Sequence, residues 1–344
     1  MRRAALSFGL VLVPVLLAAA GPVRPVSPPG LGLAVEFAPD TSPSAERLVL
    51  EEIRRTGVLV HALTVSWSRA EPAPGQYRLT EVERAARVLR QSGAVVHLDL
   101  PLVEGRVKDV PPDLTPIAFD DPKLSLRLGR LLDALRPTLL DASTLSLGYE
   151  ADTYFADKPE ELRAYRRLFD GAVQFLHKQV PHLKIGVTTA APTESVAPAV
   201  AAALEERSPV LFYIYTPFVR ETPFLHRSPD ALENDWKQLL DRSGRRPIAL
   251  VEVSYSSGAE NGSSPEKQAE FVRRLRRFVA GSDSNRLLFV RYATWRDRPA
   301  ATVRPGLNVS EITRRRASFL ENRGLQTAWG EAKPAWREWV RAGR

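Results

Sequence analysis

The stretch Ser143-Thr-Leu-Ser-Leu-Gly-Tyr-Glu150-Ala-Asp-Thr-Tyr-Phe155 predicts a short buried strand over residues 144–149 that ends on a carboxylate. Large side chains alternate along it with small ones, and the small polar series ends at Glu150. Because strand side chains point to opposite faces with a period of two, one face is apolar and the other leads to Glu150. The same alternation predicts that Tyr149 points away from Glu150. In a closed barrel of parallel strands this pattern is expected near the carboxyl end, where active sites lie.

From residue 31 onward, the sequence alternates between segments with a strand pattern and segments with a helix pattern. The predicted strands cover residues 31–37, 58–67, 94–100, 144–150, 184–189, 210–215, 247–253 and 287–295. The predicted helices cover residues 44–56, 78–92, 122–135, 159–179, 194–205, 229–241, 264–280 and 310–322. Repeated units of this kind indicate an α/β protein with a single (β/α)8 TIM barrel. A doubly wound open sheet is the main alternative, but no glycine-rich phosphate loop follows the first strand.

The amino terminus has the features of a secretory signal. A basic start at Met1-Arg-Arg3 precedes an apolar run over residues 4–17 and the small residues Ala18-Ala-Ala20. We therefore expect a signal peptide over residues 1–20, a proline-rich linker over 21–30 and the barrel domain over 31–344. The apolar run is short for a membrane span, although an uncleaved anchor is the alternative interpretation.

Composition limits the possible function classes. The chain has 344 residues, a formal net charge of +8 and no cysteine, which excludes disulfides and thiolate chemistry. The basic residues are not concentrated in any segment, so we expect no nucleic-acid partner, while an acidic polymer stays open as a partner. No His, Asp and Glu cluster has metal-ligand spacing, so we expect no metal and no cofactor, and we expect a monomer.

A second strand repeats the pattern of the first. In Pro247-Ile-Ala-Leu-Val-Glu252-Val-Ser-Tyr255, apolar residues run without a break to a carboxylate at the carboxyl end. A buried charge costs several kcal/mol unless it is paired or used, so two glutamates at strand ends suggest a functional pair. The fourth and seventh strands of a barrel face each other across its mouth. Their side chains can place Glu150 and Glu252 about 5 Å apart, which is the separation for retaining glycoside hydrolysis.

Four segments resemble the large clan of retaining (β/α)8 glycoside hydrolases that includes cellulases and endo-galactanases. These segments are Trp67-Ser-Arg-Ala-Glu-Pro-Ala-Pro-Gly-Gln-Tyr77, Leu147-Gly-Tyr-Glu150, Val251-Glu-Val-Ser-Tyr255 with Gly262-Ser-Ser-Pro-Glu-Lys-Gln268, and Gly324-Leu325 with Lys333-Pro-Ala335. The resemblance implies that Glu150 is the acid/base and Glu252 the nucleophile. One position departs from the clan, which usually has Asn directly before the acid/base glutamate to bind the sugar 2-hydroxyl. Here that residue is Tyr149.

Five further residues are candidates for substrate binding. Trp67 and Trp295 follow the second and eighth strands, where an aromatic face can stack on a sugar, although either can instead cover the barrel. Tyr215 of the sixth strand is a candidate to hydrogen-bond the nucleophile. Asp99 is expected to bind a substrate hydroxyl, with His97 beside it as a barrel-core residue. Glu36 of the first strand is a further candidate to bind a substrate hydroxyl, or it can pair with Arg291.

The sequence therefore predicts an exported glycoside hydrolase that cleaves a β-linked polysaccharide or oligosaccharide by a retaining double displacement. The predicted location is secreted or periplasmic. A glycan-binding barrel of the cell envelope that does not cut its ligand is the alternative, and Tyr149 favours it. The sugar, its linkage and endo or exo action do not follow from the fold class.

Overall fold

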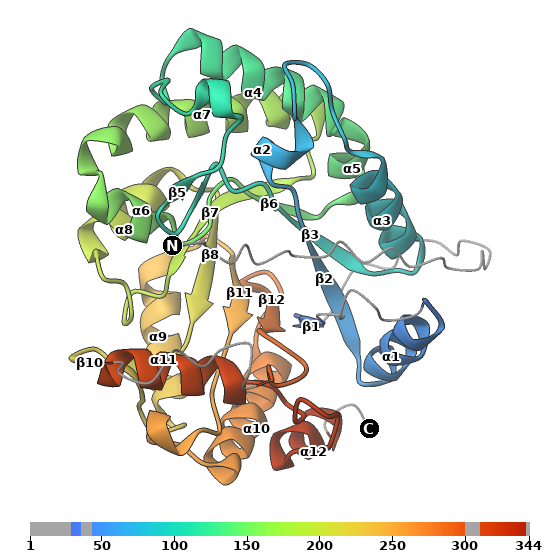
Figure 1. The fold of residues 1–344 in the computed structure, drawn as a ribbon, viewed down its shortest axis with the longest axis vertical. Helices are drawn as coiled ribbons and strands as arrows, with labels where there is room; N and C mark the ends of the chain where they lie inside the picture. The colour runs from blue at the N-terminus through green and yellow to red at the C-terminus, as the bar shows by residue number, and fades with distance from the viewer. Residues whose placement is uncertain (1–28, 36–42, 300–309, 342–344) are drawn as a thin grey trace.

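The eight predicted strands form one closed parallel barrel, which confirms the predicted fold class (Figure 1). The computed structural model describes residues 29–35, 43–299 and 310–341. The barrel strands are β1 (Gly30–Leu33), β2 (Val58–Thr64), β3 (Val95–Asp99), β6 (Thr144–Ser146), β7 (Lys184–Ala190), β8 (Val210–Tyr215), β11 (Ile248–Val253) and β12 (Leu287–Tyr292). They neighbour one another in the order β1-β12-β11-β8-β7-β6-β3-β2, and β1 pairs with β2 to close the ring.

Figure 1 shows the larger helices as an outer ring around these strands. They are α1 (Pro43–Arg55), α3 (Thr80–Gln91), α4 (Pro122–Ala134), α5 (Arg136–Asp141), α7 (Leu162–Gln179), α8 (Pro198–Arg207), α9 (Ala231–Ser243), α10 (Pro265–Gly281) and α12 (Pro334–Arg341). Several begin with proline, whose fixed backbone angle suits the first helical turn. The carboxylate of Asp121 caps α4 by accepting a hydrogen bond from the Lys123 amide at 2.7 Å.

The remaining elements, which are short except for α11, follow the carboxyl ends of the strands. They are α2 (Trp67–Ala70), the hairpin of β4 (Val103–Glu104) and β5 (Val107–Lys108), η1 (Pro112–Leu114), α6 (Ala151–Asp157), η2 (Pro159–Glu161), the hairpin of β9 (Phe218–Val219) and β10 (Thr222–His226), η3 (Ala259–Asn261) and α11 (Glu311–Asn322). Helix α11 packs on β10 and η3. Among the described residues, no helix combines the length and hydrophobicity that a membrane crossing requires.

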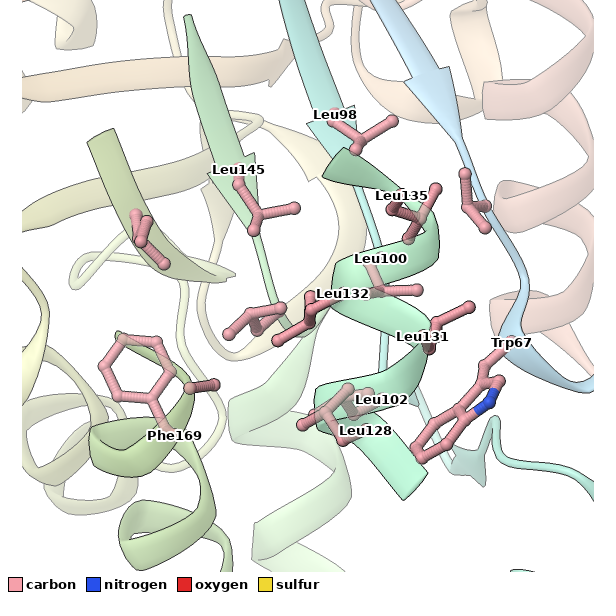
Figure 2. Packing of buried hydrophobic residues seen from close by; sticks show 14 of the residues in the cluster. Trp67, Leu98, Leu100, Leu102, Leu128, Leu131, Leu132, Leu135, Leu145 and Phe169 are labelled. Carbon is pink, nitrogen blue, oxygen red and sulfur yellow. The ribbon is translucent and has the colours of Figure 1, made fainter. Parts of the chain in front are cut away.

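Two apolar layers hold the barrel together. Its interior is filled by a small cluster of side chains from the strands: Val60, Val210, Phe212, Ala249, Val251 and Phe289. A larger layer lies between strands and helices, and Figure 2 shows the leucines of α4 facing Leu98, Leu100 and Leu145. Truncating one such leucine to alanine typically costs about 2–5 kcal/mol, so this layer fixes the positions of the strand ends.

Several predicted strands end earlier than expected, and these include β1 at Leu33 and β12 at Tyr292. Strand β2 stops at Thr64, and Trp67 begins α2 instead of ending the strand. Strand β6 stops at Ser146, whose hydroxyl donates to the carbonyl of Gly148 at 2.7 Å where the chain bends. Strand β1 begins at Gly30, the last residue of the predicted linker, and the preceding residues 1–28 lie outside the described part.

A buried ionic network fixes the loop after β2. The carboxylate of Glu71 accepts hydrogen bonds at 2.7 Å from the indole of Trp67, the amide of Gly75 and the guanidinium of Arg127. Arg127 also pairs with Asp113 at 3.0 Å. The segment that resembles the second-strand loop of the hydrolases is therefore held by a carboxylate that has no exposed surface.

Because removing one partner leaves a buried charge without compensation, we expect Glu71→Ala to lower the free energy of unfolding by about 3 kcal/mol or more. Urea denaturation followed by circular dichroism measures this change. The matched control is Glu51→Gln on the exposed surface of α1, for which a change within about 0.5 kcal/mol is expected. Equal effects of the two substitutions would contradict a structural role for the network.

Candidate active site

Glu252 reaches the barrel mouth at a bulge in β11. Leu250 is opposite Tyr213 of β8, whereas Glu252 is opposite Ile214, so one extra residue is inserted between them. The extra residue, Val251, packs in the barrel interior. A bulge breaks the alternation of side chains and re-aims the residue that follows. This explains how Glu252 lies at the mouth although its neighbour Val251 fills the core.

Both carboxylate oxygens of Glu252 accept hydrogen bonds. The hydroxyl of Tyr149 donates to Oε2 at 2.6 Å, and Nη1 of Arg323 donates to Oε1 at 2.9 Å. The Glu252 side chain is 20% exposed and that of Arg323 is 12% exposed. A half-buried carboxylate between a phenol and a guanidinium has a fixed orientation and one side still open to solvent.

Tyr149 does not point where the strand pattern predicted. Its hydroxyl reaches across the mouth to Glu252, because β6 has already ended and the strand alternation no longer applies. Instead, Tyr149 forms a parallel bridge with Glu104 of β4, and its amide donates to the carbonyl of Val103 at 2.9 Å. Burial raises the pKa of Tyr149 well above its usual value, and the charge of Glu252 raises it further. The hydroxyl therefore stays protonated and remains a donor.

Glu150 occupies a strained position at the start of α6. Its φ of 48° is in the left-handed region, which costs a residue with a side chain about 1–3 kcal/mol. The hairpin between β4 and β5 lies against it, since a Cβ added to Gly105 would be 3.3 Å from Oε2 of Glu150. Glu150 is an exposed residue, although the protein around its carboxyl is sufficient to raise the pKa of that group. Its position thus depends on the surrounding loops.

The electrostatic environment of Glu150 favours its protonated form. Burial of the carboxyl is the main cause that raises its pKa, followed by the negative charges of Glu252, Asp152 and Glu104. The positive charge of Arg316 on α11 lowers the pKa by a smaller amount. Within the described residues no donor hydrogen-bonds this carboxyl. These are the conditions in which a carboxylic acid is held ready to donate a proton.

Asp99 lies at the carboxyl end of β3 inside the barrel and is nearly buried. Its Oδ1 is 3.1 Å from Nε2 of His97, and Nδ1 of His97 is 2.8 Å from the hydroxyl of Thr144. His97 packs against Phe212 and Phe289 in the barrel interior, so it is a core residue as expected. The charge of Asp99 also raises the pKa of Glu104, after burial and the charge of Asp109, which places Asp99 close to the mouth.

The aromatic candidates occupy different places from those predicted. Trp67 has no exposed surface and donates its indole hydrogen to Glu71, so its face is not open to a sugar. Trp295 is 3% exposed and has the guanidinium of Arg296 4.0 Å above its ring. Both tryptophans pack in the apolar layers between strands and helices, because each strand ends before it. The stacking role predicted for them is not supported.

Tyr215 is also directed elsewhere. Its hydroxyl donates to Asp235 at 2.9 Å, and its ring stacks on Phe271 in the outer layer. The expectation that it binds Glu252 is wrong, and Tyr149 makes that contact instead. Glu36 lies outside the described residues. Sequence reasoning also missed Arg323, whose nearest signal was the tail resemblance that starts at Gly324.

Among the described residues, no three His, Cys, Asp or Glu side chains are arranged to hold a metal ion. The mouth instead carries acidic side chains after β3 and β6 and basic side chains on β12 and around α11. The acidic members are Asp99, Glu104 and Glu150. The basic members are Arg291, Arg316 and Arg323. Glu252 lies between the two groups, bonded to one member of the basic side.

The chain was compared with protein-family models, with curated proteins and with solved structures, and only the solved structures match it. No protein-family model matches the sequence, and no curated protein matches it. GH5_18 from Streptomyces cattleya, solved in complex with Manb1-4GlcNAc, superposes with a TM-score of 0.68 at 17% identity over 92% of this chain and 80% of that one. Xylanase 10B from Thermotoga maritima has a TM-score of 0.59 at 13% identity over 91% and 94%.

A third structure is the exo-beta-1,4-mannosidase Op5Man5 from Opitutaceae bacterium strain TAV5. Its TM-score is 0.60 at 15% identity, over 92% of this chain and 59% of that one. At these identities the likeness concerns the fold. The chain therefore has the same (β/α)8 barrel as these glycoside hydrolases, which agrees with the resemblance first seen in its strand-end motifs.

Proposed function

We propose that the chain is an exported retaining glycoside hydrolase that acts on a β-linked glycan, with Glu150 as acid/base and Glu252 as nucleophile. The observation that carries the proposal is the contrast between the two carboxyls. Glu252 is held by two donors, Tyr149 and Arg323, whereas Glu150 has an elevated pKa and receives no hydrogen bond from the part of the chain that the structure describes. Two carboxyls in one mouth with such different surroundings suit an acid and a nucleophile.

The proposed reaction gives the two glutamates separate roles. The carboxylic acid of Glu150 protonates the glycosidic oxygen while a carboxylate oxygen of Glu252 attacks the anomeric carbon, so the leaving group departs and a glycosyl ester forms. Glu150, now ionised, removes a proton from water, which attacks the same carbon and releases Glu252. Tyr149 and Arg323 orient Glu252 for the attack. Two displacements at one carbon retain its configuration.

The structural neighbours support the class of bond. One was solved in complex with Manb1-4GlcNAc, and others are described as a xylanase and an exo-beta-1,4-mannosidase. We infer a β-linked substrate for this chain. Export is supported by the basic start, apolar run and small residues of the first twenty positions.

Glycan binding without cleavage is the second candidate. It is favoured by Tyr149, which stands where the related hydrolases carry the amide that binds the sugar 2-hydroxyl and is bonded to Glu252 instead. Under this alternative the two glutamates break no bond, and glycan binding does not depend on their carboxylates. The substitutions below separate the two candidates.

If Glu252 is the nucleophile, Glu252→Gln is expected to abolish turnover and to leave glycan binding nearly unchanged, because the amide cannot form the ester. Glu150→Gln is expected to slow hydrolysis of poor leaving groups by about 10²–10⁴-fold, and of activated aryl glycosides far less in the first step. With such a substrate, azide should release a glycosyl azide of retained configuration from Glu150→Gln, which proton NMR identifies.

The matched control for these kinetics is Glu51→Gln, which changes a carboxylate on α1. A panel of β-linked glycans and aryl glycosides is assayed with wild type and the three variants, and binding is measured in parallel by calorimetry. Glycan binding by wild type without turnover of any bound glycan, and without effect of either site substitution on binding, would support the binding protein.

The raised pKa of Glu150 predicts the alkaline limit of activity. Since Glu150 must be protonated to act, activity is expected to persist above the ordinary glutamate pKa of 4.5 and to be lost as the pH rises through the elevated value. Removing the positive charge in Arg316→Gln should move this limit to higher pH. In Glu252→Gln, carbon-13 NMR should detect Glu150 titrating at lower pH than in wild type, because a negative neighbour is gone. An unchanged titration would contradict the pairing of the two carboxyls.

Mass spectrometry of protein recovered from outside the cytoplasm tests export. We expect a mature amino terminus near Gly21, because the small residues 18–20 suit a signal peptidase. Intact Met1 in that material would indicate an uncleaved anchor.

A further inference from the structure

Arg291 places a guanidinium inside the barrel near the proposed sugar site. On β12 it is two residues after Phe289, which packs in the barrel interior, and alternate residues of a strand share a face. The pairing of β1 with β12 is regular here, with Gly30 opposite Phe289 and Gly32 opposite Arg291. Arg291 therefore lies inside the barrel, one layer nearer the mouth than Phe289.

The neighbouring strand makes room for this side chain. A Cβ added to Gly32 would lie 2.9 Å from Cγ of Arg291 and 2.9 Å from the carbonyl oxygen of Val60, so only glycine leaves the space that the stem of Arg291 occupies. Nε of Arg291 donates to the carbonyl of Val251 at 2.8 Å, directly before Glu252 in the chain. The arginine is thus held on two sides, with its guanidinium next to the nucleophile position.

Within residues 29–35, 43–299 and 310–341, no carboxylate forms an ion pair with this half-buried cation. Among the described residues no acidic oxygen lies within 4 Å of the Arg291 guanidinium, and its backbone contact with Val251 uses Nε alone. The nearest candidates have other partners, since Glu252 is bonded to Tyr149 and Arg323, and Asp99 to His97. A cation removed from water without a partner is costly, so such a site is suited to an anionic ligand.

His61 and Arg316 add no negative charge to the surroundings of Arg291. Burial, together with the charge of Arg291, lowers the pKa of His61 to about 4, so that histidine is neutral at physiological pH. Arg316 lies exposed on α11, and its charge acts on Glu150 at the same mouth.

We propose that Arg291 binds the carboxylate of an acidic sugar, so that the substrate is a β-linked glycan containing uronic acid. A planar guanidinium with two free nitrogens matches a carboxylate through paired hydrogen bonds. A sugar carboxylate would take the place of the missing counter-ion, whereas a neutral hydroxymethyl group would leave the cation uncompensated. This inference rests on the proposed sugar site but not on cleavage.

The test compares matched acidic and neutral sugars. The probes are 4-nitrophenyl β-D-glucuronide and β-D-galacturonide, each against its neutral glucoside or galactoside, with kcat and KM measured separately. Wild type is expected to prefer an acidic probe by about tenfold or more in kcat/KM. Arg291→Gln is expected to reduce kcat/KM for that probe by about 10–100-fold, mainly through KM, since a charged hydrogen-bond pair contributes on that scale. The neutral probe should change by less than about threefold.

Two further variants make the result specific. Arg291→Lys keeps a charge without the planar fork and should retain part of the preference. Arg87→Gln removes an exposed arginine from α3 and should behave as wild type. Circular dichroism and thermal unfolding check that each variant is folded. If Arg291→Gln does not fold, Arg291→Lys provides the test, and a preference for the acidic probe equal to that of wild type would then contradict the inference.

Calorimetric binding of the same four probes to Glu252→Gln separates this inference from the proposed reaction. Preferential binding of an acidic probe that Arg291→Gln abolishes supports the inference even where wild type cleaves nothing. Binding or turnover of neutral probes as strong as that of acidic ones, or equal losses for both kinds in Arg291→Gln, would overturn it. Failure of wild type to bind or cleave either uronide would also overturn it.

Discussion

The hydrogen bond from Tyr149 to Glu252 joins opposite sides of the barrel mouth, and the geometry of the candidate site depends on it. It forms because β6 ends at Ser146, which frees the following residues from strand alternation. The chain then pairs with β4, and this pairing turns Tyr149 inward and leaves Glu150 in the left-handed region before α6. A three-residue strand therefore positions both the proposed acid and a donor to the proposed nucleophile.

Most of the barrel could be predicted from the sequence because its strands carry a strong pattern. The range predicted for β8, residues 210–215, agrees with the observed bounds, and β11 differs by one residue. The errors fall just after strand ends, where α2 and α6 replace expected strand or loop. Local patterning does not indicate these ends, since bends such as that at Ser146 depend on a side chain bonding its own backbone and on a hairpin from elsewhere in the chain.

The candidate site was predictable to the extent that it follows from strand ends. Glu150, Glu252 and Asp99 were identified because a carboxylate that ends an apolar strand is conspicuous. The aromatic residues were misplaced because two tryptophans follow strands that had already ended, and because Tyr215 faces the helix layer. Arg323 directly follows helix α11, far along the chain, and no local pattern links it to Glu252. Contacts between side chains that are brought together only by tertiary packing can be identified from the structure but not from a local sequence pattern.

The distribution of charge around the mouth gives the two glutamates different chemistry. Glu150 stands with Glu104 among acidic residues, and their mutual repulsion, added to burial, favours a bound proton. Glu252 stands where β12 and α11 bring Arg291 and Arg323, so it meets cations and a phenol. The two glutamates therefore have different charged surroundings because different strands and loops flank them. Arg323 pairs with Glu252, whereas Arg291 bonds only a backbone carbonyl among the described residues, and this difference underlies the proposed binding of an acidic sugar.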